Sequence, residues 1–101
     1  MVEIEKALGL LGLAYRARKL ALGKDACMMS LKKGKAQLVV LAEDLSENAA
    51  AKVRRLAGEK GVAVVCAGTK DDFGKGFGRD ELGILAVEES GFAAAIQKLL
   101  T

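Results

Sequence analysis

The segment at residues 70–83, KDDFGKGFGRDELG, combines four glycines with three basic and four acidic side chains. Glycine beside lysine can hold nucleotide phosphates, but a P-loop needs four residues between its first Gly and a Gly-Lys pair, then Ser or Thr. Here five residues separate Gly68 from the Gly-Lys pair, and Gly76 stands where the hydroxyl belongs. A dinucleotide-binding turn, G-x-G-x-x-G, fails because Arg79 replaces its third Gly. The segment is therefore not predicted to bind a nucleotide.

Catalytic and metal-binding chemistry also lacks its usual residues. The chain has no histidine, so general acid–base catalysis at neutral pH would have to run without the side chain that titrates there. Cys27 and Cys66 are the only cysteines and form no C-x-x-C pair, which leaves no set of zinc ligands. We expect both to pack unpaired as small hydrophobes in a reducing compartment. The expectation is a protein that is not an enzyme, has no catalytic residue, and takes no metal, cofactor or small-molecule substrate.

The net charge of +3 is divided unevenly along the chain. Residues 1–40 contain eight basic and three acidic side chains, whereas residues 41–101 contain eight basic and ten acidic ones. A basic half of this kind suggests a polyanionic partner. The same lysines would also suit a solvated face, and charge alone does not separate these two interpretations.

Length and hydropathy indicate a single domain, spanning residues 1–101, in a soluble cytoplasmic protein. A chain of this size can bury a core without disulfide or metal staples. No apolar run approaches the ~18 residues of a membrane span, so no membrane partner is expected. The N-terminal head MVEIEK carries two acids against one lysine, which is unlike the basic head of a secretory signal. The oligomeric state is left open.

Helical and strand-like patterns alternate along the chain. Apolar residues at helical spacing, including Ile4, Leu8, Leu11 and Tyr15, predict an amphipathic helix over residues about 3–17. The other elements expected are a short strand at 19–23, a helix at 24–33, a strand at 36–42, a helix that ends at Gly61, a strand at 62–67, a helix starting in the Thr69–Asp72 capping box, a strand at 84–87 and a helix at 90–100 capped by Ser90. The helix that ends at Gly61 would be capped either by Asp44 with Glu47 or by Ser46. The strands at 36–42 and 62–67 are continuously apolar, which is typical of burial on both faces. The order predicts an α/β fold with helices on both faces of the sheet.

The glycines of the opening segment are assigned to the backbone. Gly74 and Gly76 are expected in a short helix packed closely on the sheet, and Gly78 is expected to end that helix in the left-handed conformation. Three phenylalanines on apolar stripes are predicted to belong to the core: Phe73, Phe77 and Phe92. No aromatic surface for stacking bases is therefore expected.

A family resemblance lies in five phrases: GLLGLAYRARKLALG (9–23), KKGKAQLVVLAEDLSEN (32–48), GVAVV (61–65), FGKGFG (73–78) and ILAVEESGFAAAI (84–96). In order and spacing they resemble the ribosomal protein family of L7Ae and L30e, and most of all its small bacterial YlxQ-like branch. The resemblance covers residues about 9–97. It implies a three-layer α-β-α sandwich with about four strands. It also implies a non-catalytic, ribosomal or ribosome-associated protein that binds structured RNA, at a kink-turn or a related internal loop.

The resemblance also implies where RNA would bind. One contact falls at the start of the second helix, at Gly23, Lys24 and Asp25, and another in the loop after the glycine-rich helix, at Gly78 and Arg79. A helix N-terminus offers unpaired N–H groups and partial positive charge to phosphate, and glycine lets the backbone approach a ligand closely. Asp25 would either accept hydrogen bonds from unstacked bases or cap the helix. Arg79 would either contact RNA or pair with an acidic neighbour.

The sequence departs from the G-x-N-E-x-x-K pattern of the kink-turn binders. Asp25, Ala26 and Met29 stand where that pattern has Asn, Glu and Lys. Lys32 and Lys33 follow Met29 by three and four residues, so they can reach the same helix face and supply phosphate contacts. The alternative function is a protein-interaction module on the same fold that has lost RNA binding.

Overall fold

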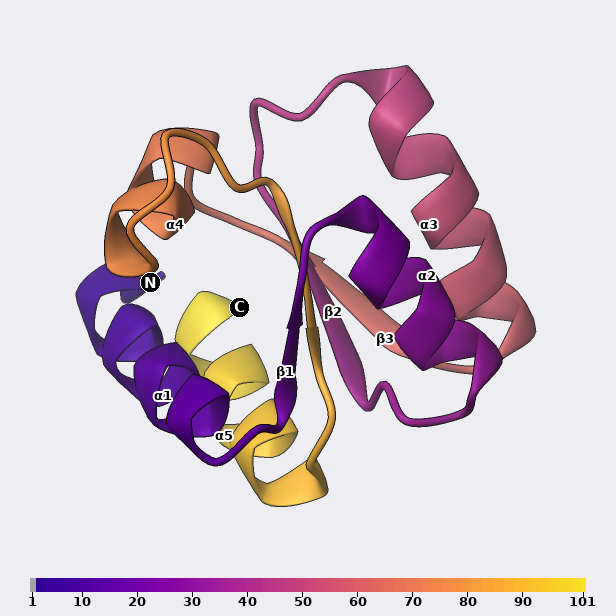
Figure 1. Cartoon of the computed structure of the whole chain (residues 1–101), viewed down its shortest axis with the longest axis horizontal. Coiled ribbons are helices and arrows are strands. Elements are labelled where there is room, and N and C mark those ends of the chain that lie inside the picture. The colour runs from indigo at the N-terminus through magenta and orange to yellow at the C-terminus, as the bar shows by residue number, and fades with distance from the viewer. Residues whose placement is uncertain (1) are drawn as a thin grey trace.

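The computed structural model describes residues 2–101, which form five helices and one four-stranded sheet (Figure 1). In chain order the elements are α1 (Ile4–Arg16), β1 (Leu20–Leu22), α2 (Lys24–Lys32), β2 (Leu38–Leu41), α3 (Glu47–Glu59), β3 (Ala63–Cys66), α4 (Lys70–Gly76), β4 (Ile84–Val87) and α5 (Ser90–Leu100). Every element expected from the sequence is present. None of the helices in this described part of the chain combines the length and apolar character needed to cross a membrane.

The sheet has the strand order β1-β4-β2-β3. Its centre is the antiparallel pair of β2 and β4, in which Val39 lies opposite Ala86. β1 runs antiparallel to β4 at one edge, and β3 runs parallel to β2 at the other, with Val40 opposite Val65. All residues of β2 and β4 are buried. The predicted α/β fold with a sheet of about four strands is confirmed.

Helices cover both faces of the sheet (Figure 1). α1, α4 and α5 lie on one face, and α2 and α3 lie on the other. Successive side chains of a strand point to opposite faces. Leu38 and Val40 of β2 therefore join the core under α1, α4 and α5, whereas Val39 and Leu41 join the core under α2 and α3. The result is the three-layer α-β-α sandwich.

The expectation that β3 is buried on both faces is wrong. Of its residues only Val65 is buried, while Ala63 and Cys66 are exposed. A continuous apolar run does not distinguish a central strand from an edge strand, and β3 forms an edge. Cys66 consequently does not pack as a buried hydrophobe: its Sγ lies 3.9 Å from the carbonyl oxygen of Ala42. Cys27 is fully buried, and both thiols are free.

Two of the helix starts follow the expected chemistry. In α3, the Oγ of Ser46 accepts a hydrogen bond from the N–H of Ala49 at 3.3 Å. In α4, Thr69 and Asp72 form the predicted capping box. The hydroxyl of Thr69 accepts from the N–H of Asp72 at 3.1 Å, and the Asp72 carboxylate accepts from the N–H of Thr69 at 3.0 Å.

The start of α5 differs from the expectation, because Glu89 rather than Ser90 is the N-cap. Glu89 has extended backbone angles, and its carboxylate accepts hydrogen bonds from the N–H groups of Gly91 and Phe92 at 2.9 and 2.7 Å. The hydrogen bond from Phe92 and then that from Gly91 hold the pKa of Glu89 below its ordinary value. Ser90 is already the first helical residue.

The glycines of α4 are used for close packing, but not against the sheet as expected. A Cβ on Gly74 would lie only 2.7 Å from the carbonyl oxygen of Arg79, in the loop that returns from α4. A Cβ on Gly76 would meet the side chain of Leu8 in α1 at 3.4 Å. Gly78 has a φ of 67°, which confirms the predicted left-handed conformation after the helix. α4 is thus clamped between its own loop and α1.

The aromatic residues are less buried than predicted. Phe73 is fully buried, whereas Phe77 and Phe92 are only half-buried against the core. Tyr15, which falls on the apolar stripe of α1, is 51% exposed. It lies in the last turn of α1, with its ring centroid 5.3 Å from that of Phe77 in an edge-to-face contact.

Gly74→Ala is expected to lower the free energy of unfolding by about 1–3 kcal/mol, because the added methyl group overlaps backbone carbonyl oxygens. Gly9→Ala in α1 is the matched control. A Cβ there meets nothing within 4 Å, so this change should raise the free energy of unfolding by up to about 1 kcal/mol. Denaturant unfolding followed by circular dichroism measures both. Equal effects of the two changes would contradict the packing of the loop against α4.

Candidate functional site

The site expected at the start of α2 is built around Gly23, which joins β1 to α2. Its N–H donates to the carbonyl of Ile84 in β4 at 2.8 Å, and its own carbonyl accepts from the N–H of Cys27 at 3.0 Å. One residue therefore ends the strand and begins the helix. Its backbone angles, φ 92° and ψ 168°, belong to a region that is essentially restricted to glycine. The fold thus requires glycine at the same position where a ligand could approach the backbone.

The N-terminus of α2 is open. Within residues 2–101, no side chain accepts a hydrogen bond from its first turn, so Asp25 is not the cap that was one of its two expected roles. The N–H groups of Lys24, Asp25 and Ala26 precede the first intrahelical bond, and all three residues are exposed. Such a terminus presents donors and a partial positive charge, which suit an anionic ligand.

Arg79 reaches this open terminus from the loop after α4. A Cβ on Gly23 would lie 3.9 Å from Nη1 of Arg79, so the guanidinium lies directly beside the glycine. The N–H of Arg79 donates to the carbonyl of Gly74 at 2.8 Å, which fixes the base of its side chain. The acid that forms an ion pair in this loop is Glu81, and its partner is Lys70, at 3.7 Å. Within residues 2–101, Arg79 makes no ion pair. The alternative prediction, that Arg79 pairs with an acidic neighbour, is therefore wrong.

The structure therefore brings together Gly23, Lys24, Asp25, Gly78 and Arg79, which we call the Gly23–Arg79 corner. Lys32 and Lys33 do not belong to it. They are exposed at the other end of α2, about 12 Å away along the helix axis at 1.5 Å per residue. Met29 lies between the two groups of charges and is 51% exposed. Positive charge thus stands at both ends of the outer surface of α2.

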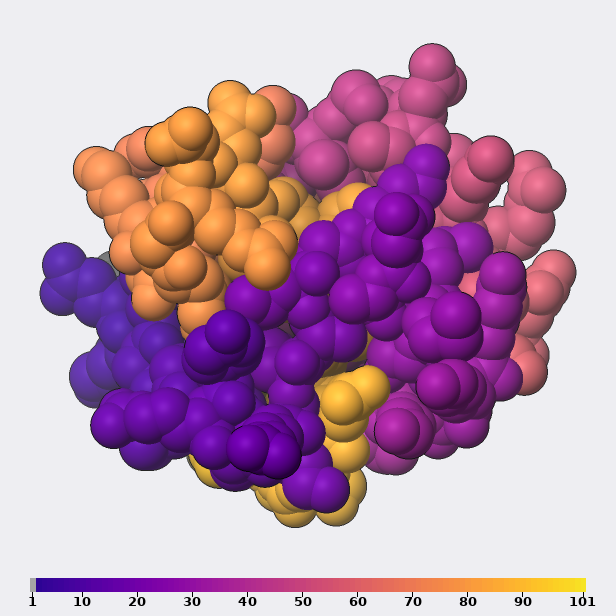
Figure 2. All heavy atoms as spheres, viewed as in Figure 1, coloured from indigo at the N-terminus to yellow at the C-terminus, as the bar shows by residue number. Residues whose placement is uncertain are grey.

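Acidic side chains border the corner on one side. Asp80 and Glu81 directly follow Arg79 and are exposed. An anionic ligand is repelled from this side. Its open approach is over β1 and α2, which share one continuous face of the molecule with α1 and the loop after α4 (Figure 2).

Phe77 connects the corner to a surface that the sequence analysis did not identify. Phe77 directly precedes Gly78 in the chain, and its ring contacts that of Tyr15, a residue on the apolar stripe of α1. Arg16 and Arg18 follow Tyr15 and are exposed. Arginines directly after the last apolar residue of a helix mark the point where its buried stripe ends, and this signal was available in the sequence.

The fold and the corner define an α-β-α sandwich protein whose candidate ligand contacts come from an open helix N-terminus and an arginine-bearing loop. The sequence profile described as the Ribosomal protein L7Ae/L30e/S12e/Gadd45 family matches residues 5–96, and the chain belongs to this family.

Individual relatives agree with this assignment. The RNA-binding protein YlxQ of Bacillus subtilis (strain 168) is 35% identical over 91 residues, which cover 90% of this chain and 91% of the relative. The RNA-binding protein YlxQ of Enterococcus faecium is 42% identical over 50 residues, covering 50% of this chain and 48% of the relative.

Solved structures show the same fold. A protein with unknown function from Bacillus halodurans C superimposes with a TM-score of 0.87 at 29% identity, covering 94% of this chain and 96% of the other. The Giardia lamblia 15.5kD RNA binding protein superimposes with a TM-score of 0.77 at 19% identity, covering 99% of this chain and 89% of the other.

The rotation of α2 about its axis decides which side chains face the site, and Cys27 reports on it. This thiol points into the core, and burial raises its pKa to about 11. At a given pH, Cys27 therefore has about 100-fold less thiolate than an ordinary thiol. The surrounding core also blocks access of a reagent to its sulfur. Iodoacetamide should modify the exposed Cys66 first, and Cys27 at a matching rate only after denaturation. Equal rates in the folded protein, followed by peptide mass spectrometry, would mean that α2 presents a different face.

Proposed function

We propose that the protein is a non-catalytic RNA-binding protein and that RNA binds at the Gly23–Arg79 corner. The observation that carries the proposal is the position of the Arg79 guanidinium beside Gly23, at the uncapped N-terminus of α2. Two segments far apart in the sequence thereby present backbone donors, a helix dipole and an unpaired guanidinium to one ligand. The two relatives named RNA-binding protein YlxQ support this function.

Each residue of the corner has a chemical role in this proposal. The N–H groups of the first turn of α2 and the guanidinium of Arg79 hold phosphate oxygens, the latter through two parallel donors. Gly23 and Gly78 carry no side chains, so the RNA backbone or a splayed base can approach the protein backbone closely. Asp25 is exposed beside these groups, and its carboxylate accepts hydrogen bonds from base amino or imino groups.

The lysines extend the contact beyond the corner. Lys24 stands at the corner itself, and Lys32 and Lys33 stand at the far end of α2. Phosphates that pass along the outer surface of α2 meet positive charge at both ends. These contacts add affinity without sequence specificity. An RNA stem beside an internal loop fits this arrangement, because its backbone is continuous and its loop bases are accessible.

The partner that we propose is ribosomal RNA or an RNA of the assembling ribosome, at a kink-turn or a related internal loop. Ala26 and Met29 bear on the choice between a kink-turn and a related internal loop. Both are exposed on α2, where the kink-turn pattern has Glu and Lys, so base contacts made by those side chains are lost. The corner retains the backbone donors and Arg79. We therefore favour a related internal loop over a strict kink-turn.

The corner and the far lysines can be tested separately by the salt dependence of RNA binding. Each phosphate contact contributes about 0.7–0.9 to the slope of log affinity against log salt. Lys24→Ala/Arg79→Ala and Lys32→Ala/Lys33→Ala should each flatten this slope by about 1.4–1.8. The measurement is fluorescence anisotropy with labelled fragments of ribosomal RNA.

Lys60→Ala/Lys98→Ala, on exposed positions of other elements, is the control and should leave the slope unchanged. All three double variants should keep the melting temperature, since exposed substitutions cost within about 0.5 kcal/mol each. An unchanged slope in both test variants, with folding intact, would reduce the lysines and Arg79 to a solvated face and overturn the proposal.

Asp25→Ala tests whether the carboxylate contacts bases. Loss of such hydrogen bonds should weaken RNA binding by about 1–3 kcal/mol, while loss of a favourable charge near the helix N-terminus costs about 0.3–1 kcal/mol of stability. Glu47→Ala is the matched control, because Glu47 is the acid in the first turn of α3. It should lower stability similarly and leave RNA affinity unchanged. Tighter binding by Asp25→Ala would show that the carboxylate only repels phosphate.

The exposed thioether of Met29 favours one alternative, a protein-interaction module on the same fold. Methionine is adaptable and common on binding surfaces that accept several partners. In this case RNA fragments would not bind to the wild-type protein at physiological salt, and Met29→Lys would abolish binding of a protein partner.

A further inference from the structure

A hollow of about 400 Å³ opens at the end of α1, and Tyr15, Arg16, Arg18 and Leu20 line it. It lies outside the Gly23–Arg79 corner. Tyr15 is 51% exposed, and both arginines are exposed. An exposed aromatic ring flanked by guanidinium groups can stack a base and neutralise its phosphates, which is the chemistry of single-stranded nucleic-acid binding.

The lining residues are held in place. The ring of Tyr15 packs edge-to-face on Phe77, with 66° between the two planes. The N–H of Arg18 donates to the carbonyl of Tyr15 at 3.0 Å, so the chain turns back immediately after the tyrosine. Arg18 has a φ of 60°, the only positive value at a non-glycine residue within residues 2–101. Strain of this kind is maintained by surrounding structure and concentrates at functional positions.

The edge of β1 joins the hollow to the corner. Gly23 donates to Ile84, and the carbonyl of Lys19 accepts from Glu88, so these residues of the N-terminal segment turn their polar backbone groups toward β4. In an antiparallel ladder, successive residues point their backbone N–H and C=O groups alternately toward and away from the neighbouring strand. Leu20 and Leu22 therefore point these groups away from β4, at the open edge of the sheet. An extended strand of RNA can thus cross from Arg79 to Arg18 along unpaired backbone donors and acceptors. Figure 2 shows this edge between α1 and α2 on the front face.

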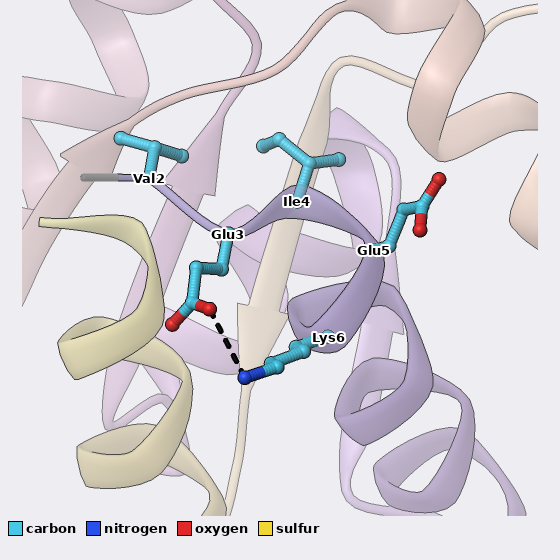
Figure 3. A pocket seen from close by; sticks show the side chains of 5 residues that line it. All are labelled: Val2, Glu3, Ile4, Glu5 and Lys6. Atoms are coloured by element: carbon cyan, nitrogen blue, oxygen red, sulfur yellow. Dashed lines mark ion pairs between the residues drawn. The ribbon is translucent and has the colours of Figure 1, made fainter.

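A second hollow, at the start of α1, has different chemistry (Figure 3). It measures about 350 Å³ and is lined by residues 2–6. Glu3 and Lys6 form an ion pair of 3.1 Å at its side, and Glu5 points away from that pair. Two carboxylates and an already paired lysine do not favour RNA. Of these two hollows, the one at Tyr15 has the side chains that suit RNA.

We propose that Tyr15 stacks on an unpaired base of the bound RNA, while Arg16 and Arg18 contact the phosphates next to that base. The inference rests on the proposed RNA-binding function and extends it by a second contact, for a single-stranded segment. Phe77 links the two contacts, because it supports the ring of Tyr15 and directly precedes Gly78 in the loop of Arg79.

The composition of the chain provides a direct test. Tyr15 is the only tyrosine and there is no tryptophan, so intrinsic tyrosine fluorescence comes from this ring alone. Titration with fragmented ribosomal RNA should quench the fluorescence, with the same midpoint as the anisotropy of the labelled RNA. Free N-acetyltyrosinamide, titrated in parallel, corrects for absorption by the RNA.

Variants separate the ring from its charges. Tyr15→Leu should weaken binding by about 5- to 150-fold, as expected for the loss of one stacked base, and Tyr15→Phe should bind as the wild type does. Arg16→Ala/Arg18→Ala should flatten the salt slope by about 1.4–1.8, whereas Arg54→Ala/Arg55→Ala, on the exposed side of α3, should not change it. Melting curves of all variants report on folding.

The outcomes distinguish the two proposals. RNA binding without quenching, and with Tyr15→Leu unchanged, would overturn the second contact and leave the Gly23–Arg79 corner intact. No binding by the wild-type protein would overturn both. Quenching that saturates together with binding and is retained in Lys32→Ala/Lys33→Ala would establish the contact at Tyr15, even if Tyr15→Leu folds poorly.

Discussion

The antiparallel pairing of β2 with β4 is the interaction on which the rest of the structure depends. Every residue of both strands is buried, so neither face of this pair can remain in water and each must be covered by helices. The alternation of side chains then divides the core into two parts, one on each side. It also leaves β1 and β3 as edges. A turn at Arg18 and a bend at Gly23 lie at the two ends of β1, and both surfaces that we propose for RNA lie there.

Much of this architecture could be predicted from the sequence, because local signals agree with the global fold. Apolar runs marked β2 and β4, and the Thr69–Asp72 capping box marked the start of α4. The same signals failed where burial depends on neighbours in space. The apolar run of β3 resembles that of β2, yet Cys66 is exposed because the strand has one neighbour instead of two. Glu89 displaced Ser90 as a cap because its longer side chain reaches two N–H groups.

The candidate site was only partly predictable, for the same reason. The residues of the corner were identified from the family resemblance, but only the fold places Arg79 beside Gly23 and separates both from Lys32 and Lys33. The spacing of the lysines along α2 suggested one basic surface. The length of the helix instead separates Lys24 at its start from Lys32 and Lys33 at its end. Helical periodicity placed Tyr15 on the apolar stripe of α1, but periodicity gives the direction of a side chain and not what lies beneath it. Its ring packs edge-to-face on the half-buried Phe77, and it is 51% exposed.

The strand order has a consequence for the order of folding. β1 joins the sheet only through β4, which is inserted between β1 and β2 although it is the last strand to be synthesised. Until then Gly23 lacks its hydrogen bond to Ile84 and has no arginine beside it. Closing such a long loop is the slow, non-local step in folding a mixed sheet. The nascent chain therefore passes through most of its synthesis without the Gly23–Arg79 corner, which forms together with the completed fold.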